Sequence, residues 1–92
     1  MKAETLFEII NEAKTLKDLQ LKGLKRGTRR DKSMNWDTNT IRGSLNKQIE
    51  DWQESYQNYE PEDKEHDDEK RRLADIINVA SLLFLRLDGV KI

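Results

Sequence analysis

The residues of this chain best suited to bind an anion are basic side chains between positions 22 and 32. They are Lys22, Lys25, Arg26, Arg29, Arg30 and Lys32. Ammonium and guanidinium groups neutralise phosphate oxygens, and arginine can hold a phosphate through two parallel hydrogen bonds. Trp36 follows closely and offers a flat surface on which a nucleotide base could stack. A phosphate-contacting role is therefore one reading of this stretch, and an ordinary solvated loop is the other.

The composition argues against several other chemistries. The chain has no cysteine, which removes disulfides, thiolate nucleophiles and thiolate metal ligands. Its 17 basic and 18 acidic residues give a formal net charge of −1, so we expect neither nucleic acid nor a membrane as a partner. The longest apolar stretch, at about 80–87, is too short to span a bilayer, and the first residues do not resemble a secretory signal. We expect a cytoplasmic protein.

The elements that must hold any site are predicted to be helices. Four glycines and one proline in 92 residues, with 38% charged and 35% hydrophobic residues, suit helices that face solvent. Apolar residues recur at three- and four-residue steps in three segments. The sequence therefore predicts an all-α fold of three main helices in one domain over residues 1–92. The apolar positions are Leu6, Ile9, Ile10, Ala13 and Leu16; then Ile41, Leu45, Ile49, Trp52, Tyr56 and Tyr59; then Leu73, Ile76, Ile77, Ala80, Phe84 and Leu87.

The connection between the first two helices is predicted to be a basic loop over about residues 22–37. The first helix should end near Leu21, because Gly23, Gly27 and the repeated positive charge all disfavour a helix. The second helix should begin near residues 37–40, where short side chains can accept hydrogen bonds from unpaired backbone amides.

The connection between the second and third helices is predicted to be an acidic linker over about residues 60–68. Pro61 ends the second helix, because proline lacks an amide proton and disfavours helical geometry in the residue before it. Acids at the start of the third helix interact favourably with its dipole. Gly89 is placed to stop that helix.

The third helix carries apolar residues on two sides, and this pattern predicts an assembly. Val79, Leu82 and Leu85 lie opposite its main stripe. One neighbour in the same chain cannot cover both sides. We expect the main stripe to pack inside the subunit and the other side to pack on a second copy, which gives a homo-oligomer through the last helix. In a monomer, that second side would instead be exposed and available to bind a different protein.

Three parts of the chain resemble the core of the MazG-like nucleotide pyrophosphohydrolases. They are Trp36, residues 45–56 and residues 73–80. In that family, an E-E-x-x-E motif and an E-x-x-D motif on two helices hold Mg²⁺ ions that bridge a nucleoside triphosphate, and a metal-activated water releases pyrophosphate. Acids spaced by three and four residues share one helical face, and Mg²⁺ prefers oxygen ligands. The resemblance implies a MazG-like helical bundle.

Carried onto this chain, the two motifs have lost most of their acids. The resemblance places the first at Lys47, Gln48 and Asp51 and the second at Arg72 and Asp75. Asp51 and Asp75 are then the only carboxylates left to bind metal. A cation at Lys47 or Arg72 would repel Mg²⁺ and could itself neutralise a phosphate. The motifs therefore predict a change from metal-mediated to direct phosphate binding.

Other interpretations of the motif region stay open. A register shifted by three residues would restore acidic spacing through Glu50 and Glu54, but the apolar stripe of this helix turns both toward solvent. Asp51 and Arg72 could also form an ion pair without a ligand, worth about 0 to 1 kcal/mol. Asparagine, as at Asn78, is common at this point in some MazG-like sequences and could contact a nucleotide or cap a helix contact.

Three functions follow as hypotheses. The first is a binding protein that holds, and in a phage could sequester, a nucleotide or nucleotide-derived signal without a cofactor. Its site would comprise Lys47, Gln48, Asp51, Arg72, Asp75 and Asn78, with Arg26, Arg29, Arg30 and Trp36. The second is an active Mg²⁺-dependent nucleoside triphosphate pyrophosphohydrolase, with Asp51, Asp75 and acids from residues 60–69 as metal ligands. The third is a small helical interaction module, such as a viral inhibitor.

Overall fold

The computed structural model of the chain describes residues 1–30, 36–57 and 66–90, and these residues form an all-α fold. Its helices are α1 (Ala3–Glu12), α2 (Lys14–Arg30), α3 (Thr38–Gln57) and α4 (Asp67–Leu87). The predicted fold class is confirmed. Within the described ranges, no helix is both long and apolar enough to cross a membrane.

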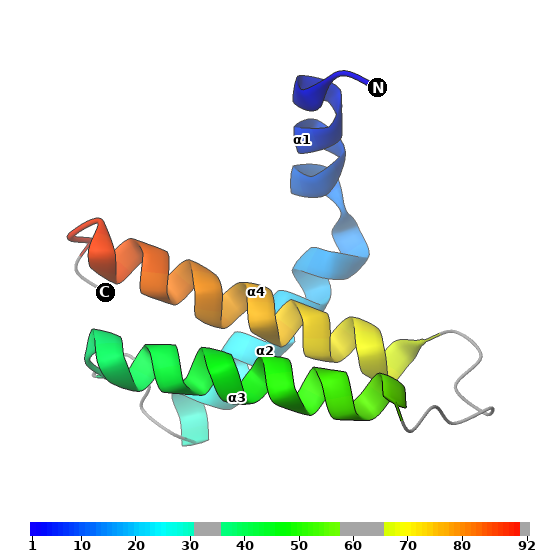
Figure 1. Cartoon of the computed structure of the whole chain (residues 1–92). Coiled ribbons are helices and arrows are strands. Elements are labelled where there is room, and N and C mark those ends of the chain that lie inside the picture. Colours follow the sequence, from blue (N-terminus) through cyan, green and yellow to red (C-terminus); the bar gives the residue numbers. More distant parts are fainter. Residues whose placement is uncertain (31–35, 58–65, 91–92) are drawn as a thin grey trace.

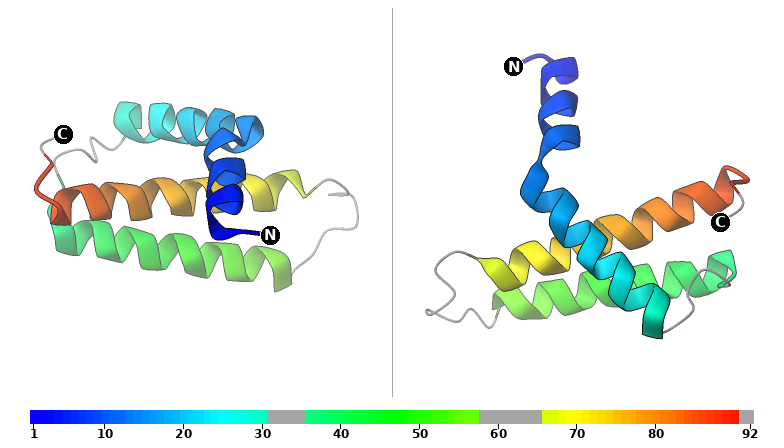
Figure 2. Two further views of the ribbon diagram at one scale, coloured as in Figure 1. Left: turned by 90° about the horizontal axis from the view of Figure 1, so that it is seen from above. Right: turned by 180° about the vertical axis from the view of Figure 1, so that it is seen from behind.

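The central helix of the bundle is α4. It runs antiparallel to α3 on one side, and α2 crosses it on another (Figures 1 and 2). Figure 1 shows α1 rising away from the other helices, on the side of α4 opposite α3. Three helices therefore form the bundle, and α1 stands apart from it.

The most deeply buried apolar residues belong to α3 and α4. Ile41 and Ala74 are the two fully buried apolar residues among those described. The predicted stripe of α3 is confirmed at Leu45, Ile49 and Trp52, which are half-buried. Its last two members differ: Tyr56 is exposed, and Tyr59 lies outside the described residues. Glu50 and Glu54 point to solvent, as the stripe predicts.

The capping predictions for α3 and α4 are confirmed. Asp37 Oδ1 accepts a hydrogen bond of 2.7 Å from the backbone amide of Thr40, and this bond lowers the pKa of Asp37 below its usual value. Acids occupy the first turn of α4, where the helix dipole favours negative charge. Gly89 adopts a positive φ of 79°. The Gly89 and Val90 amides then donate to the carbonyls of Arg86 and Leu85, the pattern of a Schellman motif.

The predicted basic loop is wrong over its first part, because α2 continues to Arg30. Gly23 and Gly27 are four residues apart and therefore share a helical face, and both are half-buried. The packing of that face against α4 outweighs the low helix propensity of glycine. The predicted first helix is also divided: Ala13 is extended, with ψ 96°, so α1 and α2 are separate helices. Nothing in the local sequence explains that break.

The acidic linker is only partly described. Residues 60–65, which include Pro61, lie outside the described residues. Asp67 and Asp68, which the prediction placed in the linker, belong to α4. The third predicted helix therefore begins within the acidic run rather than after it.

The predicted assignment of the two sides of α4 is wrong for most of their residues. On the side expected to face a second copy, Val79 and Leu82 are half-buried within the bundle and Leu85 is 38% exposed. On the expected core stripe, Ile76 is half-buried and the other members are exposed. Phe84 is 67% exposed and Leu87 is 60% exposed. The reason is that α2 and α3 occupy two sides of α4 and leave the third uncovered. We call this uncovered set the open stripe; it comprises Leu73, Ile77, Ala80, Phe84 and Leu87.

Candidate functional site

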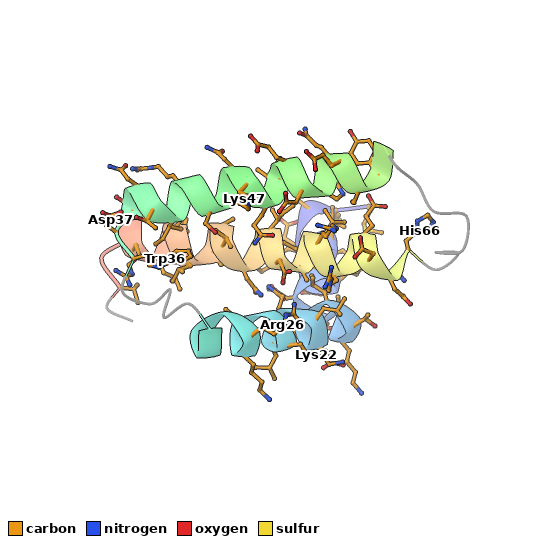
Figure 3. All side chains as sticks on the ribbon, turned by 90° about the horizontal axis from the view of Figure 1, so that it is seen from below. Lys22, Arg26, Trp36, Asp37, Lys47 and His66 are labelled. Carbon is orange, nitrogen blue, oxygen red and sulfur yellow. The ribbon has the colours of Figure 1, made fainter. Side chains whose placement is uncertain are left out.

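Half of the predicted site residues come together around the middle of α4. Arg72, Asp75 and Asn78 lie on successive turns of α4 itself, while Arg26 approaches from α2 and Asp51 from α3. We call this set, Arg26, Asp51, Arg72, Asp75 and Asn78, the charged band. Figure 3 shows the three helices that supply it, with Arg26 on the α2 side of α4.

The α2 side of the charged band depends on a glycine. A Cβ added at Gly23 would lie 2.5 Å from Asp75 Oδ1 and 3.0 Å from Asn78 Nδ2. Without a side chain at this position, the backbone of α2 can approach both polar groups. Asn78 Nδ2 donates a hydrogen bond of 2.9 Å to the carbonyl oxygen of Gln20. One turn further along α2, Arg26 Nη2 lies 3.4 Å from Asp75 Oδ1.

The α3 side of the charged band centres on Arg72. Its Nε donates a hydrogen bond of 2.8 Å to Asp68 Oδ2, one turn earlier in α4. This bond raises the pKa of Arg72, partial burial opposes the rise, and the negative charges of Asp68, Asp51 and Asp75 add to it. The hydrogen-bonding partner of Arg72 is therefore Asp68 rather than Asp51, and Asp51 acts on Arg72 through its charge alone. Arg71 Nη2 donates to the other oxygen of Asp68 at 2.9 Å.

The remaining predicted residues lie farther from the charged band or outside the described part. Gln48 is half-buried and Lys47 is exposed, both on α3. Trp36 is half-buried at the end of the bundle where α3 begins and α4 ends (Figure 3). Asp75 lies twelve residues before the end of α4, which is about 18 Å along the helix at 1.5 Å per residue. Trp36, which lies near that end, is therefore far from Asp75. Arg29 and Arg30 belong to the last turn of α2, and their side chains lie outside the described part.

The acids of the charged band are poorly arranged for metal. Asp51 and Asp75 belong to different helices, and the positive charge of Arg72 interacts with both. Among the described residues, no group of three His, Cys, Asp or Glu side chains is arranged to hold a metal ion. Hard divalent cations take six or more oxygen ligands. Asp51 and Asp75 alone therefore make a weak site for Mg²⁺.

Three residues of the site were missed from the sequence. Gly23 had a usable signal, because Gly23-x-x-x-Gly27 places two small residues on one helical face. Asp68 also had one, since it precedes Arg72 by four residues, the spacing of an ion pair within a helix. Gln20 had none, because it takes part through its backbone carbonyl.

These features define a small helical bundle with a charged, partly exposed band across its central helix. Comparisons with protein-family models, with curated proteins and with solved structures found no match to this chain. The resemblance to MazG-like proteins therefore stays a prediction from the motif residues.

Proposed function

We propose that the charged band binds a phosphorylated nucleotide compound and holds it without cleaving it. The observation that supports this most directly is the placement of two guanidinium groups from two helices on either side of Asp75. The side chain of Arg26 is 44% exposed and that of Arg72 is 30% exposed. Both can therefore reach a ligand in solvent while their stems stay fixed against the bundle.

Arg26 is the more available of the two for a phosphate. Its 3.4 Å contact with Asp75 is longer than the 2.7 to 2.9 Å typical of charge-assisted hydrogen bonds. Exposed ion pairs of this kind contribute about 0 to 1 kcal/mol. A phosphate offers several acceptor oxygens to the guanidinium, so it can compete with Asp75 for Arg26, provided that the Asp75 carboxylate turns away from the phosphate charge. Asp75 and Asn78 are then placed to hydrogen-bond hydroxyl or amino groups of the sugar or base.

Binding without cleavage is the better-supported form of this proposal. Hydrolysis in the resembling family needs several carboxylates around Mg²⁺, and the charged band supplies Asp51 and Asp75 with an arginine beside them. A phosphate bound directly by arginine needs no metal. Pyrophosphate release remains the alternative, in which the ligand phosphates complete the coordination of Mg²⁺.

A thermal-shift screen with nucleoside triphosphates, cyclic oligonucleotides and dinucleotide cofactors, each with and without Mg²⁺, tests the proposal. A ligand at ten times its Kd stabilises the folded state by about 1.4 kcal/mol, which raises the Tm of a domain of this size by about 5 to 10 °C. We expect a metal-independent shift and recovery of intact ligand by chromatography. A monophosphate product formed only with Mg²⁺ would establish the enzyme, and the absence of any shift would refute nucleotide binding.

Two matched variants locate the site in the same assay. Arg26→Ala should remove most of the ligand-induced shift and leave the Tm of the free protein almost unchanged. Lys22→Ala is the control, because Lys22 is an exposed cation one turn earlier on α2. An equal loss in both variants would indicate general electrostatic attraction rather than a site at the charged band.

A further inference from the structure

Among the described residues, two helix faces each expose at least four apolar side chains, and both lie outside the charged band. One is the open stripe of α4. The other is the apolar side of α1, where four large side chains are exposed, Phe7 by 64%. These four are Leu6, Phe7, Ile9 and Ile10.

The open stripe has the spacing of a surface that packs against another helix. Its members follow one another at steps of four, three, four and three residues. This is the a/d pattern of a helix whose side chains interlock with those of a second helix. Ala80 lies at its centre between the larger Ile77 and Phe84, so a second helix can approach closely there. The stripe runs from Leu73 to Leu87, about 21 Å at 1.5 Å per residue.

The length and the amphipathic pattern of α1 suit a helix that packs on the open stripe. Its ten residues span about 15 Å, so it fits within the length of the open stripe. Its apolar residues share one side, while Glu4, Glu8 and Glu12 lie on the other at four-residue steps. A helix that lies on an anionic membrane instead carries lysine and arginine on its polar side. The acidic side of α1 therefore favours a protein partner.

The exposed area of the chain is large for a monomer of its mass. The accessible surface is 7361 Å² for 10.9 kDa, whereas a compact monomer of that mass exposes about 5,600 Å². The difference is about 1,800 Å². A standard stable interface buries about 800 Å² on each partner. The chain as a whole therefore exposes more than enough area for an interface of that size.

We infer that two copies of this chain form a symmetric dimer in which α1 of each copy packs on the open stripe of the other. In a two-fold dimer both contacts form together, so all four uncovered surfaces are buried at once. α1 points away from its own bundle (Figure 1), and only Ala13 separates it from α2. It is therefore placed to reach a second copy. No residue of the charged band takes part, so the dimer and nucleotide binding can fail independently.

Light scattering after size-exclusion chromatography of the full chain tests this arrangement. We expect the unaltered protein to have twice the chain mass of 10.9 kDa. Phe7→Lys on α1 and Phe84→Glu on α4 should each give a monomer, because each substitution disrupts both reciprocal contacts. Glu8→Lys and Glu50→Lys, on exposed polar positions of α1 and α3, are the controls and should stay dimeric.

Mixing the two monomeric variants distinguishes this dimer from every other arrangement. In a mixed dimer, one contact is unaltered and the other joins the introduced lysine to the introduced glutamate. We therefore expect the mixture to recover the mass of two chains. Circular dichroism checks that helix content is kept; where it is not, Ile10→Ser and Leu87→Ser replace the two variants.

Three outcomes would overturn the inference. A monomeric unaltered protein would show that the surfaces do not bring two copies together. A Phe7→Lys protein that stays dimeric would place the interface elsewhere, for example between two copies of α4. Monomeric variants that fail to associate when mixed would mean that α1 does not pack on the open stripe of a second chain.

Discussion

The two sides of α4 that lie inside the bundle are built differently. Toward α3, the face of α4 that carries Glu69 also carries Ile76, Val79 and Leu83, at helical spacing. Glu69 accepts a hydrogen bond of 2.9 Å from Trp52 Nε1 at one end of this contact. Toward α2, the contact includes polar groups around a glycine, namely Asp75 and Asn78. The contact with α3 is therefore mainly apolar burial, whereas the contact with α2 adds a hydrogen bond and an ion pair to its packing.

This difference assigns separate tasks to the two contacts. Apolar burial contributes about 25 cal/mol per Å² and holds over small shifts in position. A single hydrogen bond makes only a small net contribution to the free energy of unfolding, but it requires a particular geometry. We infer that the contact of α3 with α4 supplies most of the stability. The contact of α2 with α4 sets the position of Arg26 and can rearrange around a ligand.

The largest expected effect is on the apolar contact. Ile41 is fully buried, so Ile41→Ala should lower the free energy of unfolding by about 2 to 5 kcal/mol. Ile41→Val, which keeps most of the volume, should cost about 0.5 to 1.5 kcal/mol. Urea denaturation followed by circular dichroism measures both. Equal losses in the two variants would indicate that the α3 contact tolerates cavities and is not the main source of stability.

A pair of glycine substitutions tests the polar contact. Gly23 and Gly43 both lie within helices, but an added Cβ meets Asp75 and Asn78 only at Gly23 and meets nothing within 4 Å at Gly43. Gly43→Ala should raise the free energy of unfolding by about 0.5 to 1 kcal/mol through helix propensity. Gly23→Ala should bring no such gain and should fall about 1 to 2 kcal/mol below Gly43→Ala, because Asp75 and Asn78 must move.

The same pair has a second readout. If the proposed nucleotide binding holds, Gly23→Ala should also weaken it, because displacement of Asp75 shifts the charge opposite Arg26. Gly43→Ala should bind normally. Stabilisation of equal size in both variants would show that α2 does not approach α4 as closely as the Gly23 geometry requires.

The parts of the fold that could be predicted from the sequence are those fixed by local interactions. Asp37 caps α3 through an amide three residues away, and Gly89 ends α4 through neighbouring carbonyls. The second half of α2 could not be predicted in this way. Its glycines disfavour a helix locally, and their benefit appears only when α4 lies against them. The uncovered side of α4 also escaped prediction, because apolar periodicity does not say which side a neighbour will cover.

The candidate site likewise has a part that local spacing predicts and a part that depends on how the helices pack. Arg72, Asp75 and Asn78 share one helix, so their proximity follows from spacing alone. Arg26 was expected to reach the site from a loop, and it instead projects from a helix that crosses α4. The preference of Arg72 for Asp68 over Asp51 depends on how far apart α3 and α4 pack. The distance between two helices is set by the side chains of both. The apolar pattern of one helix therefore does not predict it.

The smallest expected effect is the pH dependence of the Asp68 pair. The hydrogen bond from Arg72 lowers the pKa of Asp68 below its ordinary value of 3.8. In the unfolded chain the group titrates near the ordinary value, so on acidification the unfolded state takes up the proton first. The stabilisation by Asp68 is therefore complete well above pH 3.8 and is lost as the pH falls through the lowered folded pKa.

Asp68→Asn isolates this contribution. The side chain of Asp68 is 46% exposed, so solvent screening limits its contribution to about 1 kcal/mol or less. Urea denaturation at several pH values should give a smaller loss of stability below pH 4 for Asp68→Asn than for the unaltered protein. Asp67→Asn, at the neighbouring exposed acid in the same first turn, is the comparison. Parallel pH profiles for all three proteins would mean that Arg72 does not depend on Asp68 and is free to pair with Asp51 across the apolar contact.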